Sequence, residues 1–155
     1  MSHIVQDDES EAMVSLIQFD PTSLDEISRS IRSMAVRVKI YHSIDQFLEN
    51  HDADSSGCAL APLLPGSESI QMLRAVIERC WSLPLIFVAP PRSNLTSAVR
   101  LMRLGAVDVL GHPINLELLQ QRVKEAIHLD AERRTQARFR LEANQRISSL
   151  TPRER

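Results

Sequence analysis

"LPLIFVAP", residues 83–90, is the stretch that decides the fold. It is an unbroken apolar run of the length of one strand. Strands at the centre of a parallel sheet read this way, because helices cover both of their faces. The run therefore predicts a central strand of an α/β domain.

Further strand candidates lie on either side of this run, and helical patterns separate them. In the segment 22–34, for example, Leu24, Ile27, Ile31 and Met34 recur at helical spacing. We expect the other strands at 13–19, 36–42, 58–63 and 107–113, and helices at 22–34, 43–50, 67–80, 93–106 and from 114 to about 150. This alternation predicts a doubly wound, five-stranded parallel sheet with helices on both faces and a long C-terminal helical extension.

The composition is that of an ordinary globular domain: 155 residues, 43% hydrophobic, 25% charged and a net charge of −2. Nothing global points to nucleic acid or to anionic lipid, and no apolar run reaches the length of a membrane span. Cys58 and Cys80 show no metal or redox spacing, so we expect them to pack as small hydrophobes. Without a signal pattern at the N-terminus, the sequence favours the reducing cytoplasm.

Parallel sheets bind their ligands beyond the carboxyl ends of the strands. The residues expected there are Phe19 and Asp20, Ala61 and Pro62, Ala89 and Pro90, and Gly111 and His112. They follow the first, third, fourth and fifth strands. No nucleophilic triad and no glycine-rich phosphate loop is recognisable in the sequence, so we expect neither an enzyme nor a cofactor.

The strand order, "AVRLMRLGAVDVLGHP" (98–113) and the closing "LTPRER" (150–155) resemble a response-regulator receiver domain of the FixJ/NarL/LuxR type. The resemblance covers about residues 13–155. It implies a CheY-like fold, with residues 151–155 as the first residues of a LuxR-type DNA-binding module. It divides the chain into a disordered leader (1–12), a receiver-like domain (13–128), a helical linker (129–150) and that module.

The resemblance also implies five groups for phosphoryl transfer, namely three acids, a hydroxyl and a lysine. At the matching positions the sequence has Phe19, Asp20, Ala61, Ala89 and His112, so only Asp20 keeps the group that the family uses. Because a methyl group accepts no phosphoryl group, we expect a degenerate phosphorylation site and no metal: a pseudo-receiver.

Several residues at these strand ends have both a functional and a purely structural interpretation. Asp20 is either a relic metal ligand or the N-cap of the first helix, and the cap is favoured. His112 is either a pH sensor or a polar residue at a strand end, and the following bond to Pro113 is a candidate for the cis geometry. Arg92 is placed to bind an anion, but a solvated loop is favoured. The five histidines are scattered, which argues against a zinc site.

The tail 116–150 is longer than the last helix of a receiver. Its apolar positions Leu116, Val123, Ile127, Ala137 and Leu141 form an imperfect heptad that Asp130, Arg134 and Asn144 interrupt. A marginal coiled coil is one interpretation and an exposed linker the other. The arginines in this segment (133, 134, 138, 140) are also candidates for contacts with DNA phosphates. The acidic residues between them favour the other interpretation, a linker face exposed to solvent.

The predicted function is that of a regulatory domain that works by protein contacts without aspartyl phosphorylation. We expect a homodimer; the interface candidates are Val99, Arg103, Val109, Leu119, Val123 and Ile127. DNA is expected to be bound only through a module beyond this chain, and no membrane is involved. The alternatives are an adaptor that docks on a kinase or on another regulator, and a small-ligand sensor with a pocket lined by Phe19, Ala61 and Ala89.

Overall fold

The computed structural model describes residues 11–52 and 54–154. Five parallel strands form one sheet in the order β2-β1-β3-β4-β5. The strands are β1 (Ala12–Ile17), β2 (Val36–Tyr41), β3 (Gly57–Pro62), β4 (Leu85–Val88) and β5 (Asp108–Leu110). The run that opened the sequence analysis contains β4, all four residues of which are buried. The predicted α/β architecture is confirmed.

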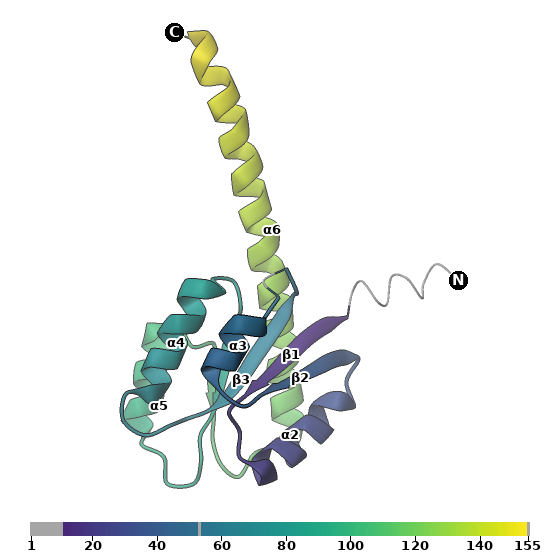
Figure 1. The fold of residues 1–155 in the computed structure, drawn as a ribbon, viewed down its shortest axis with the longest axis vertical. Helices are drawn as coiled ribbons and strands as arrows, with labels where there is room; N and C mark the ends of the chain where they lie inside the picture. The colour runs from purple at the N-terminus through teal and green to yellow at the C-terminus, as the bar shows by residue number, and fades with distance from the viewer. Residues whose placement is uncertain (1–10, 53, 155) are drawn as a thin grey trace, which may run out of the picture.

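Five helices alternate with the strands (Figure 1). They are α2 (Pro21–Arg32), α3 (Ile44–Asn50), α4 (Glu68–Arg79), α5 (Leu95–Leu104) and α6 (Leu116–Glu154). Each helix was predicted, within a few residues at its ends. Four of them begin at a capping side chain that accepts a backbone N–H, those of Asp20, Ser43, Asn94 and Asn115.

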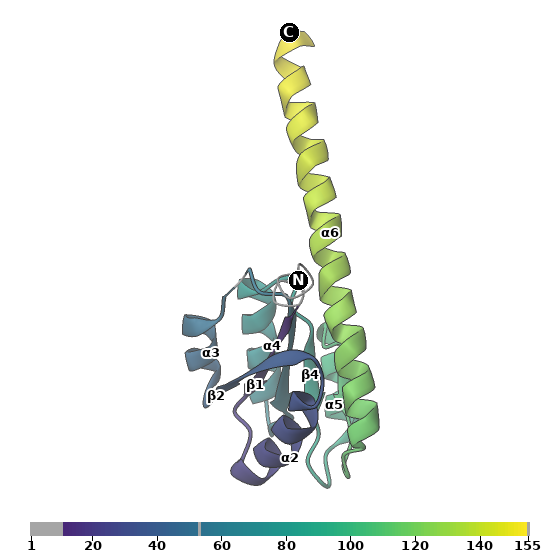
Figure 2. The ribbon, with the colours of Figure 1, turned by 90° about the vertical axis from the view of Figure 1, so that its right-hand side faces the viewer.

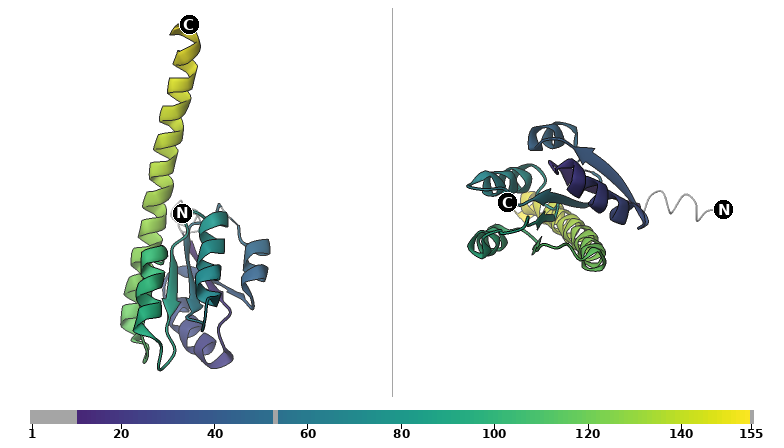
Figure 3. Two further views of the ribbon diagram at one scale, coloured as in Figure 1. Left: turned by 90° about the vertical axis from the view of Figure 1, so that its left-hand side faces the viewer. Right: turned by 90° about the horizontal axis from the view of Figure 1, so that it is seen from below.

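Two apolar clusters fill the space between the sheet and the helices. One lies under α3, α4 and α5 and includes Phe47, Leu73, Phe87 and Leu101. The other lies under α2 and α6 and includes Leu16, Ile27, Ile86 and Val123. Figure 2 and both views of Figure 3 show α6 running along one side of the sheet. The fold therefore has three layers, with the sheet in the middle.

Helix α6 has 39 residues, which makes it about 58 Å long at 1.5 Å per residue. It starts just after β5, at the carboxyl ends of the strands, and runs back past the amino ends. Its second half then projects from the domain (Figures 1 and 2). The predicted extension is therefore a continuation of the last helix of the domain, and it leaves from the edge opposite to the carboxyl ends of the strands.

Two boundaries differ from the predicted ones. Strand β1 already begins at Ala12, which was assigned to the leader, because Ala12 is buried and pairs with Val36. Helix α6 continues to Glu154 instead of ending near Leu150. The rest of the predicted leader, 1–10, lies outside the described residues.

Candidate functional site

The residues predicted at the carboxyl ends of the strands do lie along one edge of the sheet. Ala61 is the fifth residue of β3 and pairs with Phe87 of β4, which in turn pairs with Val109 of β5. Ala89 directly follows β4, and its N–H donates to the carbonyl of Leu110 at 2.7 Å. The register therefore places the ends of β3, β4 and β5 side by side.

These residues do not all surround one cavity. Ala89, Pro90, Gly111 and His112 line the same cavity, but Phe19 and Ala61 are not part of it. Ala61 is fully buried and Ala89 nearly so, both in the cluster under α3, α4 and α5. Phe19 packs against the other cluster, under α2 and α6. The pocket lined by Phe19, Ala61 and Ala89, which the alternative of a small-ligand sensor requires, does not form, because Phe19 turns to the opposite side of the sheet.

Asp20 is the N-cap of α2. Its Oδ2 accepts the N–H of Ser23 at 3.0 Å, and Pro21 follows it in the first turn. The hydrogen bond from the Ser23 backbone lowers the pKa of the Asp20 carboxyl below its ordinary value. The prediction of a cap is confirmed, and the carboxylate is engaged in starting a helix.

His112 is exposed at the end of β5, and the peptide bond between His112 and Pro113 is cis, as predicted. His112 lines a cavity of about 420 Å³ together with Val109, Gly111, the loop after β4 and the start of α5. Arg92 and Ser93 line this cavity and also a second one of about 340 Å³ that reaches Leu64 and Pro65. Arg92 has a positive φ of 65° and is exposed. This edge thus presents one cation, one imidazole and hydroxyl groups to solvent.

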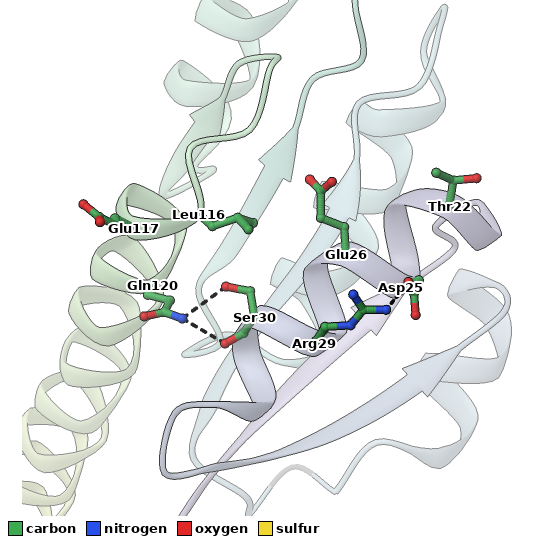
Figure 4. Close-up of a pocket in the computed structure, with 8 residues that line it drawn as sticks. All are labelled: Thr22, Asp25, Glu26, Arg29, Ser30, Leu116, Glu117 and Gln120. Atoms are coloured by element: carbon green, nitrogen blue, oxygen red, sulfur yellow. Dashed lines mark hydrogen bonds and ion pairs between the residues drawn. The ribbon is translucent and has the colours of Figure 1, made fainter.

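A further groove, of about 470 Å³, lies between α2 and the start of α6 (Figure 4). Asp25, Glu26 and Glu117 line it, and Arg29 forms an ion pair with Asp25 at 2.7 Å. At its side Gln120 donates from Nε2 to the carbonyl of Ser30 at 2.9 Å, joining the two helices. None of the site residues predicted from the sequence lines this groove.

The interface candidates fall into two groups. Val99 and Arg103 are exposed on α5, as an interface requires. Leu119 and Val123 are 0% exposed, so these two are wrong as interface residues. Ile127 packs against the cluster under α2 and α6 but is only partly buried, so it stays a prediction. Val109 packs against the other cluster. The reason is that the apolar stripe of α6 faces the sheet of its own chain up to Ile127.

A polar cluster that the sequence did not predict lies where α6 passes the amino ends of the strands. Asp130 is 0% exposed, and its carboxylate accepts hydrogen bonds from the N–H of Gly57 and from Nε of Arg134. The sequence predicted a solvated linker for the segment that contains Asp130 and Arg134, residues 129–150. No sequence signal separates a buried acid of this kind from the many exposed ones in the same helix.

The remaining chemistry is sparse. Cys58 and Cys80 are buried free thiols, as predicted, and burial raises the pKa of Cys58 to about 12. Within residues 11–52 and 54–154, no group of three His, Cys, Asp or Glu side chains is arranged to hold a metal ion. Over the same residues no helix is long and apolar enough to cross a membrane.

Comparison with known proteins finds response regulators among the relatives of this chain. No protein-family model matches the chain. The response regulator protein TmoT of Ectopseudomonas mendocina is 24% identical over 94% of this chain and 66% of its own length. The transcriptional regulatory protein FixJ of Bradyrhizobium diazoefficiens is 25% identical over 90% of this chain and 68% of its own length.

Solved structures agree with these relatives. The response regulator StyR superposes with a TM-score of 0.76 and 23% identity, covering 90% of this chain and 71% of that one. The structure of FixJ-N superposes with a TM-score of 0.67 and 18% identity over 76% of this chain. The chain has the CheY-like receiver fold. Its sequence is similar to those of response regulators such as TmoT, TodT and FixJ. This receiver-like chain spans 63–66% of the length of TodT of Pseudomonas putida and of TmoT.

Proposed function

We propose that this receiver-like chain is the regulatory domain of a two-component-type transcription regulator and that it works without aspartyl phosphorylation. The observation that carries the proposal is the buried methyl group of Ala61 near the end of β3, where the resemblance places the phosphoacceptor. Of the residues that follow β1, β3, β4 and β5 directly, Asp20 is the only acid, and it caps α2. One exposed carboxylate is a weak Mg²⁺ site.

The test is incubation of the purified chain with acetyl phosphate and Mg²⁺, followed by intact-protein mass spectrometry. A receiver with an intact acceptor aspartate is treated in parallel and gains a phosphoryl group. We expect no such adduct on this chain. An adduct that hydroxylamine removes would be an acyl phosphate, and it would overturn the proposal.

We further propose that two copies of the chain associate through exposed apolar side chains. Helix α5 exposes Leu95, Val99 and Met102, and the extension exposes Phe139 and Leu141. Leu95, Val99 and Met102 share one face of α5, whereas Phe139 and Leu141, two positions apart, point to different sides of the extension. Exposed apolar side chains are a common feature of protein interfaces. Sedimentation equilibrium of Val99→Glu/Met102→Glu and of Phe139→Glu/Leu141→Glu separates the two surfaces. We expect at least one pair to shift the chain to monomer; a wild-type chain that is monomeric at high concentration contradicts the dimer.

In the proposed regulator, the extension connects the receiver-like domain to a DNA-binding module that begins near Thr151. The transcription-regulator relatives continue beyond the matched region, since the chain matches 68% of the FixJ protein. Residues 1–155 by themselves are then expected not to bind specific DNA. A mobility-shift assay on specific and scrambled DNA checks this, and tight sequence-specific binding would contradict the assignment.

A further inference from the structure

The last part of α6 that contacts the domain, residues 128–134, is called the root of the extension. Up to Ile127 the helix is held by apolar packing against the sheet. After Arg134 its side chains are exposed as far as Ile147, apart from the half-buried Ala137. Between these two parts, contact with the domain is made by Asp130, Arg133 and Arg134. The last contacts that the helix makes before it leaves the domain are therefore polar.

Asp130 makes the central contact. Its Oδ2 accepts the N–H of Gly57, the first residue of β3, at 2.8 Å, and also Nε of Arg134 at 3.1 Å. The carboxylate is fully buried. A buried carboxylate is strongly unfavourable unless it is paired and hydrogen-bonded, so this residue stays in place only while both partners do.

Arg134 and Arg133 extend the contact to two loops. From Arg134, Nη2 donates to the carbonyl of Ser55 at 2.8 Å and Nη1 to that of Asp54 at 3.4 Å, both just before β3. Arg133 donates to the carbonyl of Ser82, before β4, at 3.3 Å. The planar, forked guanidinium makes such contacts directional, whereas apolar packing would tolerate sliding.

We propose that Asp130 and Arg134 form a latch that fixes the direction of the extension by holding its root against the amino ends of β3 and β4. Because the latch holds on to residues 54–57, a partner or a conformational strain that acts there changes the direction of the extension. This regulatory role rests on the proposed function, in which the extension carries that output. The latch lies at the edge opposite to Ala61, Ala89 and His112, so it acts independently of the altered phosphorylation positions.

The test measures the direction of the extension itself. Spin labels are placed at Glu78→Cys on α4 and Gln145→Cys on the extension, in a Cys58→Ala/Cys80→Ala background, with excess unlabelled protein to suppress distances between chains. Arg134→Gln and Asp130→Asn are compared with Arg138→Gln. Arg138 is exposed on the same helix and makes no hydrogen bond or ion pair in the described part of the chain.

We expect the distance distribution to broaden about twofold in the two latch variants and to be unchanged in Arg138→Gln. Hydrogen exchange of the Gly57 amide and of amides 128–140 should be about tenfold faster in the latch variants, as expected for the loss of a charged hydrogen bond. If Asp130→Asn or Arg134→Gln fails to fold, Arg134→Lys is used instead, because lysine keeps the charge but cannot reach two carbonyls at once.

Distributions and exchange rates that match those of Arg138→Gln would overturn the latch. A broadened distribution that leaves association and DNA binding of the full regulator unchanged would keep the latch as a structural device and reject its regulatory role. An adduct with acetyl phosphate would reject the proposed function without affecting the measured direction of the helix.

Discussion

The carboxylate of Asp130 lies 2.8 Å from the backbone nitrogen of Gly57, although 73 positions separate the two residues in the sequence. This hydrogen bond joins the first residue of a central strand to the helix that leaves the domain. Glycine suits position 57 partly for this reason, because the backbone there must lie close both to α6 and to β1.

Replacing Gly57 by alanine should destabilise the domain severely. A Cβ at this position would lie 1.8 Å from the carbonyl oxygen of Met13, and the φ of +152° is unfavourable for other residues. We expect a loss of at least about 3 kcal/mol in the free energy of unfolding, measured with urea. Gly111→Ala is the control, because its Cβ would meet nothing within 4 Å. A Gly57→Ala variant as stable as this control would show that the strands are free to move apart.

Ser15→Ala should stabilise the protein. The Ser15 hydroxyl is buried in β1 and has no hydrogen-bond partner among the described residues. Removing an unsatisfied buried hydroxyl is expected to gain about 1 kcal/mol. Ser69→Ala is the matched control: the buried Ser69 hydroxyl accepts the N–H of Leu64 at 2.7 Å, so its loss should cost about 1 kcal/mol. Thermal unfolding of both variants checks the prediction, and equal effects of the same sign would refute it.

Asp20→Ala should reduce stability at neutral pH by about 1 kcal/mol, since the cap of α2 is lost. The pKa of Asp20 is lowered in the folded protein. The stabilisation by its charge is therefore complete above the ordinary value of 3.8 and is lost as the pH falls through the lowered pKa. Urea unfolding of wild type and variant between pH 6 and pH 2 should show the difference shrinking toward acid. Asp20→Asn keeps the cap but should lose this pH dependence; a pH-independent difference between wild type and Asp20→Ala would contradict the role of the charge.

Cys58 should be inert in the folded protein. It is fully buried, and its pKa of about 12 leaves almost no thiolate at neutral pH. We measure the reaction of the thiols with a chromogenic disulfide reagent at pH 8. In the native protein Cys58 should react only at the rate of unfolding, and in urea both thiols should react immediately. Comparison with Cys58→Ser assigns the signal of Cys80. Rapid reaction of both thiols under native conditions would mean that β3 is exposed.

The order of strands and helices was predictable because each element has its own local pattern. The apolar run of β4 and the spacing of Ile27 and Ile31 in α2 report burial directly. The same kind of pattern does not distinguish an apolar stripe that packs on its own sheet from one that packs on a second chain. Leu119 and Val123 therefore appeared as interface residues, although they face their own sheet.

The candidate site was predictable only in part. The capping role of Asp20 is local in sequence and could be inferred from the neighbouring Pro21. The alternative of a pocket lined by Phe19, Ala61 and Ala89 could not be decided beforehand, because a sequence does not reveal to which face of the sheet a loop side chain turns. Asp130 was missed for a related reason: its partners are the backbone of Gly57 and the side chain of Arg134, and a backbone partner distant in the sequence has no residue type by which it could be recognised.

The length of α6 turns small angles into large displacements. From Arg134 to Glu154 the helix advances by about 30 Å at 1.5 Å per residue. A tilt of about 10° at Arg134 would thus carry Glu154 sideways by about 5 Å, roughly one helical pitch. The extension acts as a lever arm with its fulcrum at the amino ends of the strands, so a shift of a fraction of an ångström among the hydrogen bonds there is magnified at the far end.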